Sequence, residues 1–247
     1  MILTAGIYEQ IIWGSIRMMS GKFSTFVSLA WGAIRSFGKP KVFCIGRNKT
    51  GLTSMKQAFQ ELGYAVGSPS ISKRLHLFQY WTVRDFRRLF LFCLTAQAFA
   101  DSSFSLPFTF QALDQRFRGS KFILTVRDSP EEWYHSLTHF HAALFGNGQV
   151  PTAEDLKQAE YPRKGFMYTF NRTVYHTPED DPYNKAVLIA HYNAHNNAIV
   201  EYFRHRPNDL LILNVAEPDA YNKLCDFLGK PRLNRSFPHK NKTSDFE

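Results

Sequence analysis

Four short apolar runs, separated by segments with helical character, set the pattern of the chain from residue 41 onward. The runs comprise residues 42–45, 96–100, 122–126 and 210–215. Each has the length of a strand that is buried on both faces. Helices are predicted over residues 53–62, about 106–118 and 185–206. Strands that alternate with helices predict an α/β fold, a three-layer sandwich whose central parallel sheet is flanked by helices.

A polar loop bracketed by two glycines follows the first run. Gly46 and Gly51 enclose it, and the side-chain donors in the loop and at the start of the next helix are Lys49, Thr50, Thr53 and Ser54. The first N–H groups of a helix lack intrahelical acceptors and carry the positive end of its dipole. A strand, a glycine loop and a helix N-terminus together form an anion site, to which Lys49 adds a positive charge. We therefore predict capture of a phosphate or sulfate group, with an ordinary strand–turn–helix as the alternative.

Charged residues also follow the second and third apolar runs. Asp101 ends the second run, Arg127 and Asp128 end the third, and Pro130 fits the first turn of the next helix. Ligands in open parallel sheets bind beyond the carboxyl ends of the strands. We therefore expect Asp101, Arg127 and the Lys49 loop to lie at one edge of the sheet. A salt-bridged strand end at Arg127 and a capping role for Asp101 are the alternatives.

These stretches resemble the nucleotide-binding elements of sulfotransferases that use 3′-phosphoadenosine-5′-phosphosulfate (PAPS). The order Lys-Thr-Gly-Leu-Thr-Ser is similar to their 5′-phosphosulfate loop, commonly Lys-Thr/Ser-Gly-Thr-Thr, with Leu52 in place of a threonine. Arg127 and Ser136 resemble the pair that holds the adenosine 3′-phosphate. The resemblance extends over residues 41–242 and implies a P-loop NTPase-like fold. The residues it implies for cofactor binding are Arg47, Asn48, Lys49, Thr50, Gly51, Leu52, Thr53, Ser54, Arg127 and Ser136.

The resemblance also implies a general base that takes the proton of the acceptor. Many sulfotransferases place a histidine or an acidic residue after the strand that precedes the arginine strand, and Asp101 resembles that residue in position. His139, on the helix after Arg127, is a second candidate. Lys49 is expected to stabilise the charge that develops on the leaving nucleotide. The predicted catalytic residues are therefore Lys49, Asp101 and His139.

The hypothesis that follows is a transferase that moves the sulfuryl group of PAPS to a hydroxyl or amine of a small-molecule, lipid or carbohydrate acceptor. Such a transfer needs no metal, and no C-x-x-C pair indicates zinc. One alternative is a P-loop kinase or hydrolase, although Lys49 precedes the second glycine instead of following it. Another is a non-catalytic nucleotide-binding module at a membrane surface. Stabilisation by 3′,5′-adenosine bisphosphate without magnesium, by magnesium-ATP, or by neither would distinguish the three.

The composition is that of an ordinary globular protein. Of 247 residues, 44% are hydrophobic and 21% are charged, and the 23 phenylalanines indicate a well-filled core and an apolar acceptor cleft. The formal net charge of +9 suits an anionic ligand or surface. No stripe of Lys and Arg interleaved with aromatics predicts a nucleic-acid partner. Cys44, Cys93 and Cys225 lie in apolar runs, as buried reduced thiols do. Nothing in the sequence indicates an oligomeric state.

Residues 1–40 differ from the sulfotransferase-like domain that we expect over residues 41–247. Two apolar stretches with basic flanks predict a helical appendage, either packed on the domain or in peripheral contact with a membrane. Neither stretch reaches the ~18–20 residues of a membrane span. We therefore expect a cytoplasmic enzyme, with membrane association as an alternative. Within the domain, residues 68–72 predict a turn, 73–94 an amphipathic helical region, and 161–183 an insertion or lid over the acceptor.

Overall fold

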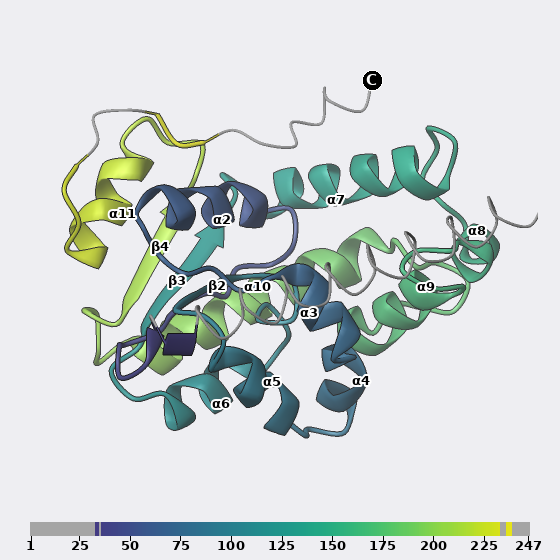
Figure 1. Cartoon of the computed structure of the whole chain (residues 1–247). Helices are drawn as coiled ribbons and strands as arrows, with labels where there is room; N and C mark the ends of the chain where they lie inside the picture. Colours follow the sequence, from purple (N-terminus) through teal and green to yellow (C-terminus); the bar gives the residue numbers. More distant parts are fainter. Residues whose placement is uncertain (1–32, 35, 233–235, 239–247) are drawn as a thin grey trace, which may run out of the picture.

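A computed structural model describes residues 33, 34, 36–232 and 236–238 (Figure 1). The strands in these ranges are β1 (Val42–Cys44), β2 (Ala98–Ala100), β3 (Lys121–Val126) and β4 (Leu210–Asn214). They form one sheet in the order β2-β1-β3-β4, and each neighbouring pair is parallel. The predicted parallel sheet is therefore confirmed, with one strand at each apolar run.

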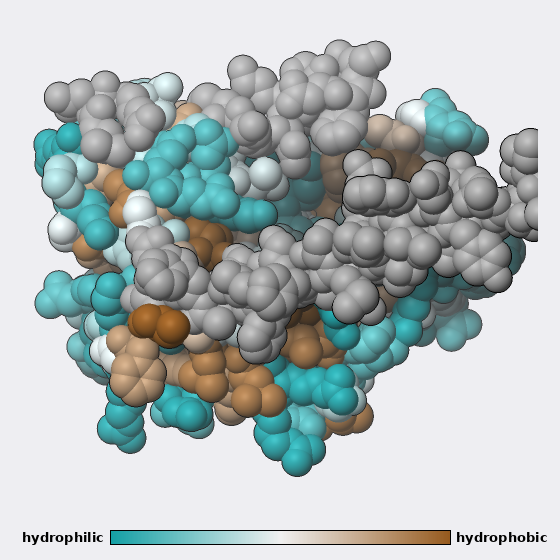
Figure 2. All heavy atoms as spheres, viewed as in Figure 1, coloured by the Kyte–Doolittle hydropathy of each residue, from teal (hydrophilic) through white to brown (hydrophobic). Residues whose placement is uncertain are grey.

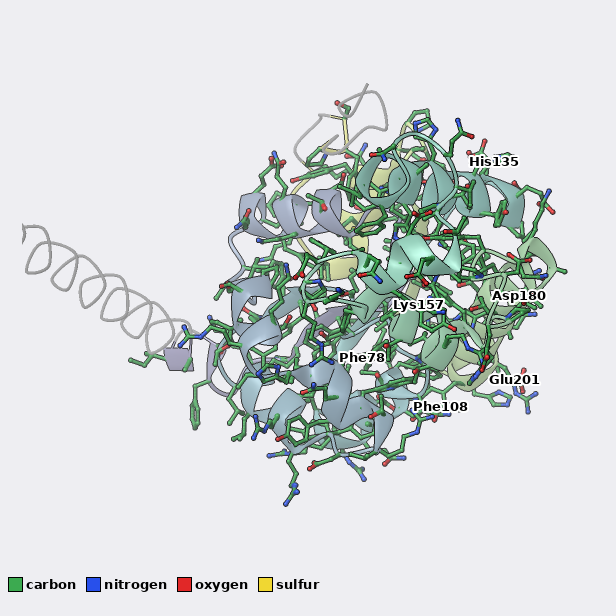
Figure 3. All side chains as sticks on the ribbon, turned by 90° about the vertical axis from the view of Figure 1, so that its right-hand side faces the viewer. Phe78, Phe108, His135, Lys157, Asp180 and Glu201 are labelled. Carbon is green, nitrogen blue, oxygen red and sulfur yellow. The ribbon has the colours of Figure 1, made fainter. Side chains whose placement is uncertain are left out.

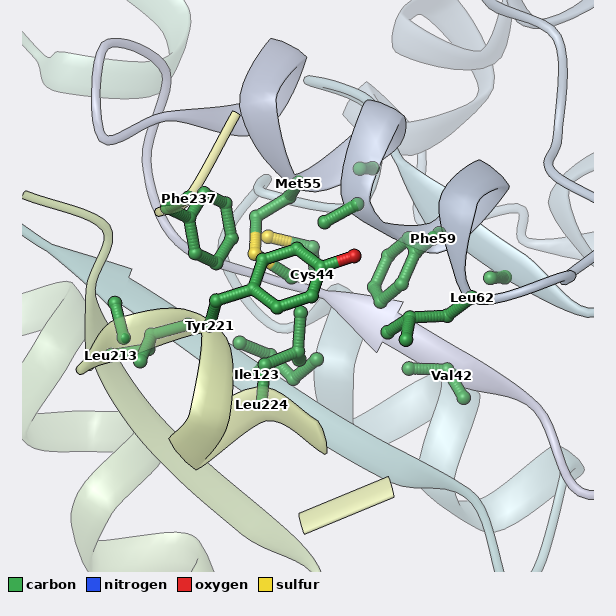
Figure 4. Close-up of a cluster of buried hydrophobic side chains, with 14 of the residues drawn as sticks. Val42, Cys44, Met55, Phe59, Leu62, Ile123, Leu213, Tyr221, Leu224 and Phe237 are labelled. Atoms are coloured by element: carbon green, nitrogen blue, oxygen red, sulfur yellow. The ribbon is translucent and has the colours of Figure 1, made fainter. Parts of the chain in front are cut away.

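Helices cover both faces of this sheet. One face carries α2 (Leu52–Glu61) and α11 (Ala220–Leu228), and the other carries α5 (Arg87–Cys93), α6 (Thr109–Arg116) and α10 (Lys185–Phe203). Successive side chains of a strand point to opposite faces. Cys44 accordingly belongs to a buried cluster with Met55 of α2 and Tyr221 of α11 (Figure 4). Phe43 faces the other way, into the cluster that contains Phe203 of α10. The predicted three-layer sandwich follows from this alternation.

A further group of helices extends beyond the sheet (Figure 1). It comprises α7 (Pro130–Phe145), α8 (Ala153–Gln158), α9 (Phe166–Phe170) and the π-helical turn η1 (Asn171–Tyr175). These elements share a buried cluster that includes Trp133, Phe170 and Tyr175. Residues 161–183, predicted as an insertion or lid, thus contain helical structure with its own buried side chains. Their closure over an acceptor stays a prediction.

Residues 68–94 were expected to form a turn followed by an amphipathic helical region. They form α3 (Pro69–Arg74), α4 (Leu77–Thr82) and α5. Pro69 occupies the first helical position, where a missing N–H removes no intrahelical bond, so a helix begins where a turn was expected. His76 and Arg84 have positive φ angles of 53° and 57° and separate the three helices. Such angles are uncommon outside glycine, so the sequence pattern did not predict breaks between helices at these two positions.

The predicted appendage over residues 1–40 lies outside the described residues, apart from positions 33, 34 and 36–40.

Apolar side chains gather at the surface near α5, where Leu91 and Leu94 are exposed (Figure 2). In the part of the chain that the structure describes, no helix combines the length and the apolar character needed to cross a bilayer.

Candidate active site

Two glycines place the loop between β1 and α2 against the ends of β3 and β4. At Gly46, any Cβ would collide with the backbone and hydroxyl of Thr125 on β3. At Gly51, φ is +101° and a Cβ would lie 2.6 Å from Cγ2 of Val215, directly after β4. The hydroxyl of Thr50 is hydrogen-bonded to that of Thr125 at 2.6 Å. The loop is thus fixed at the carboxyl edge of the sheet, where ligands bind in open α/β folds.

The loop presents Lys49 and the start of α2. Gly51 caps α2 without a side-chain hydrogen bond, so an anion there would meet backbone N–H groups and the positive end of the helix dipole. Lys49 has a left-handed backbone (φ 69°), and its ammonium Nζ lies 3.6 Å from the ring centroid of Phe140. Burial, and then the neighbouring Arg127, lower the pKa of Lys49 to about 8. Lys49 is therefore a half-buried cation whose charge titrates near neutral pH.

Arg127 joins the loop to α7. Its Nε donates to the carbonyl oxygen of Lys49 at 2.8 Å, and its Nη2 donates to Oγ of Ser136 at 3.4 Å. Its backbone N–H donates to the hydroxyl of Tyr192 on α10 at 3.0 Å. The structure therefore brings together Lys49, Arg127 and Ser136. Their donors converge beside one loop, which suits a ligand with more than one anionic group.

Two predicted cofactor contacts, Arg47 and Asn48, turn inward. Arg47 is 1% exposed, and its Nη1 donates to the carbonyl oxygen of Ser105. The side-chain amide oxygen of Asn48 accepts from the hydroxyl of Tyr175 at 2.9 Å, and its carbonyl oxygen accepts from Nε1 of Trp133 at 2.9 Å. Both side chains therefore fix the loop to its surroundings. The physical reason is that η1 and α7 pack beneath the loop, which the sequence pattern does not show.

The first turn of α2 contributes in another way. The side chain of Leu52 packs against the core cluster under α2, so only its backbone N–H is directed by the helix toward an anion. Thr53 is exposed and Ser54 is buried.

A cavity of about 410 Å³ opens beside Lys49. Asp101, directly after β2, lies in its wall, and its Oδ1 accepts from Oγ of Ser72 at 3.1 Å and from the N–H of Ser103 at 2.9 Å. The apolar part of the wall is formed by Leu77, Phe78, Leu106, Phe140, Phe166, Met167 and Phe170. A carboxylate and an ammonium thus line one mainly apolar space. This arrangement can hold an apolar molecule with a polar group at the carboxylate.

The comparison with protein families agrees with this geometry. A family model described as a sulfotransferase domain matches residues 41–246, most of the chain. The chain belongs to this sulfotransferase family. It is accordingly a transferase, and the matched range begins one residue before β1. No curated protein matches the chain.

His139 does not lie in the cavity. His139 is exposed and is not among the residues that line the cavity. His135, one turn earlier on the same face of α7, lies at the margin of the molecule, away from Phe78 of the cavity wall (Figure 3). Among the three candidate catalytic residues, Lys49 and Asp101 therefore share the cavity, and His139 does not.

His141 lines the cavity of the sulfotransferase, although the sequence did not single it out. Its Nδ1 is 2.8 Å from the hydroxyl of Tyr183, and burial, followed by Lys49, lowers its pKa to about 3. It is therefore a neutral imidazole at physiological pH. Leu137 and His141 are four residues apart on α7 and both are buried, so helical spacing was the signal that could have revealed it.

The described ranges contain no cluster of three or more His, Cys, Asp or Glu side chains that could hold a metal ion.

The sequence did not predict which aromatic residues form the wall of the cavity. Phe78 comes from α4, Phe140 from α7, and Phe166 and Phe170 from α9. Only the folded chain brings these distant segments together.

Proposed function

We propose that this sulfotransferase takes its sulfuryl group from PAPS and transfers it to a hydroxyl or amine of an apolar acceptor. The observation that carries the proposal is the position of Arg127, whose guanidinium donates to both the Lys49 loop and Ser136. PAPS carries a 5′-phosphosulfate and a 3′-phosphate and therefore requires two anion sites. The loop and the Arg127–Ser136 pair supply one each.

Each residue of the site has its own role in the proposed reaction. PAPS supplies an activated sulfuryl group when it is bound. The N–H groups at the start of α2 and the ammonium of Lys49 stabilise the negative charge that develops on the leaving nucleotide. Arg127 and Ser136 hold the 3′-phosphate through charge-assisted hydrogen bonds. Asp101 accepts the proton of the acceptor hydroxyl or amine. The apolar cavity excludes water, which strengthens each of these interactions.

Thermal-shift measurements test the donor. Stabilisation by 3′,5′-adenosine bisphosphate in the absence of magnesium is the expected result. Stabilisation by magnesium-ATP alone would favour a P-loop kinase or hydrolase, and no stabilisation by either nucleotide would favour a non-catalytic module. Transfer of label from ³⁵S-PAPS to a panel of apolar alcohols, phenols and amines then tests the reaction itself.

A further inference from the structure

The cavity beside Lys49 has an apolar interior and a polar mouth. Leu77, Leu106, Met167 and Phe170 are buried in its wall. The ring of Phe78 lies 5.2 Å from that of Phe166 and 5.3 Å from that of Phe170, measured between centroids. A volume of about 410 Å³ is in the range of small-molecule pockets, about 300–1,000 Å³. The interior is therefore suited to one compact apolar or aromatic scaffold.

The mouth is positively charged. Lys73 and Arg163 are exposed residues of the cavity wall. Nζ of Lys73 lies 5.3 Å from the ring centroid of Tyr161, and Cζ of Arg163 lies 5.7 Å from that of Phe166. Both aromatic residues also line the cavity. These contacts hold the two cations over the apolar wall instead of directing them away from it.

Among the described residues, no carboxylate is paired with either of these two charges. Within the described ranges, neither Lys73 nor Arg163 takes part in an ion pair. The amide oxygen of Gln79, when oriented toward Arg163, accepts from Nη1 at 2.6 Å and from Nη2 at 3.0 Å. This partner orients the guanidinium but is neutral. Asp101 is the acid of the cavity wall, and Ser72 and Ser103 already bind it.

This distribution of charge selects among acceptors. An ammonium group would have to pass Lys73 and Arg163 and then lie near Lys49, all of which repel it. A neutral hydroxyl meets no such repulsion at Asp101. An anionic group on the far end of the same molecule would be attracted to the mouth.

We propose that the acceptor is a hydroxylated apolar molecule that carries an anionic group, with its hydroxyl at Asp101 and its anion at Lys73 and Arg163. The inference rests on the proposed sulfotransferase reaction. In that reaction the hydroxyl oxygen forms a bond to sulfur, the bond from sulfur to the bridging phosphate oxygen breaks, and the proton passes to Asp101. Carboxylate, sulfonate and phosphate groups share the chemistry that the mouth recognises.

Calorimetric titration of the full chain with matched naphthols tests this. The probes are neutral 2-naphthol, anionic 6-hydroxy-2-naphthoate and 6-hydroxy-2-naphthalenesulfonate, and cationic 6-(aminomethyl)-2-naphthol. We expect both anions to bind about tenfold tighter than 2-naphthol, the order expected for two solvent-exposed ion pairs. The cationic probe should bind more weakly than 2-naphthol. The preference for anions should shrink as salt is added.

The double variant Lys73→Gln/Arg163→Gln should lose the preference, so that it binds the anionic probes and 2-naphthol with about equal affinity. Lys164→Gln is the matched control, because Lys164 is exposed beside Arg163 but does not line the cavity. It should keep the preference. Three results would overturn the inference. They are binding of 2-naphthol that is as tight as or tighter than binding of the anionic probes, no binding of any probe, and an unaltered preference in the double variant.

A parallel arm separates this inference from the proposed donor. Stabilisation by 3′,5′-adenosine bisphosphate is measured on the same samples. If the nucleotide stabilises the protein and no charge preference is seen, only the acceptor inference fails. If the charge preference is seen and the nucleotide has no effect, only the donor proposal fails.

Discussion

Lys49 is a half-buried cation with a pKa that falls within the working range of an enzyme. Burial and Arg127 lower this pKa to about 8, so the ammonium is present below that pH and is lost above it. Since only the charged form stabilises the leaving nucleotide, kcat/KM for the donor should fall about tenfold per pH unit above pH 8. Measured pH profiles check this expectation.

The variant Lys49→Arg keeps its charge at these pH values and should lose the alkaline limb. Lys49→Ala should be folded and nearly inactive at every pH. An alkaline limb that persists in Lys49→Arg would assign the titration to another group.

Arg127 donates to the Lys49 loop and to Ser136 through one guanidinium. Arg127→Ala should weaken binding of 3′,5′-adenosine bisphosphate by ~1.5–3 kcal/mol, the usual range for hydrogen bonds to a charged group. Arg118→Ala, an exposed arginine before β3 at the opposite end of the strand, removes the same charge and should have little effect. Calorimetry that finds equal affinities for the two variants would make Arg127 a purely structural strand end.

Asp101 lies in the wall of the acceptor cavity, held by Ser72 and Ser103. Asp101→Asn keeps the size of the side chain but cannot take a proton, so turnover should fall by ~10²–10⁴ with nucleotide affinity little changed. His139→Ala should be nearly neutral, because His139 is exposed outside the cavity. Normal turnover by Asp101→Asn would exclude Asp101 as the base.

At the scale of elements, the loop between β1 and α2 depends on Gly51. Alanine there would combine a left-handed backbone with a contact of 2.6 Å to Cγ2 of Val215. Gly51→Ala should therefore destabilise the protein by about 1–2 kcal/mol for the backbone and about 1–3 kcal/mol for the contact. Gly63→Ala has a similar φ of +80° with no atom within 4 Å of the added Cβ, so it reports the backbone cost alone. Urea unfolding of both variants measures the difference, and equal losses would show that Val215 yields.

The sequence predicted elements well where one local rule decides them. Each strand falls on a short, mainly apolar run, and the helix after β3 has a proline in its first turn and Ser129 as its N-cap. The division of residues 73–94 could not be predicted in this way. It depends on the left-handed backbones of His76 and Arg84, which no local sequence pattern encodes.

The same distinction holds for the residues of the candidate site. Lys49, Arg127 and Asp101 follow strands of a parallel sheet, so topology alone brings them to one edge. The inward orientation of Arg47 depends on Ser105 and on Tyr175 of η1, and His141 is hydrogen-bonded to Tyr183; each partner is more than 40 residues away in sequence. Non-local packing of this kind is what sequence reasoning lacks.

At the scale of the whole molecule, buried histidines should make stability depend on pH. Burial, followed by Arg47, lowers the pKa of His195 to about 3, while its Nε2 lies 3.0 Å from the carbonyl oxygen of Ile45. The unfolded chain takes up a proton at this residue below its ordinary pKa of 6.5, and the folded chain does not. The free energy of unfolding is therefore undiminished above pH 6.5 and falls as the pH drops from 6.5 toward 3.

His195→Gln removes the titrating imidazole, and the amide of the new side chain can still donate to the carbonyl oxygen of Ile45. Between pH 7.5 and 5.0 the variant should lose about 2 kcal/mol less unfolding free energy than the wild type. Urea denaturation at the two pH values measures this. The same loss in both proteins would show that His195 is protonated in the folded state.

The hydrogen bonds of Asn48 have a practical consequence for making the protein. Asn48, Lys49 and Thr50 form an Asn-x-Thr sequence that oligosaccharyltransferase recognises in unfolded chains. A glycan on Asn48 would break its bond with Tyr175 and occupy the loop. Removing the acceptor sequence through Thr50 would instead break the contact with Thr125. A glycan attached at Asn48 during secretion would therefore inactivate the protein, so expression for activity assays should keep the chain out of the secretory pathway.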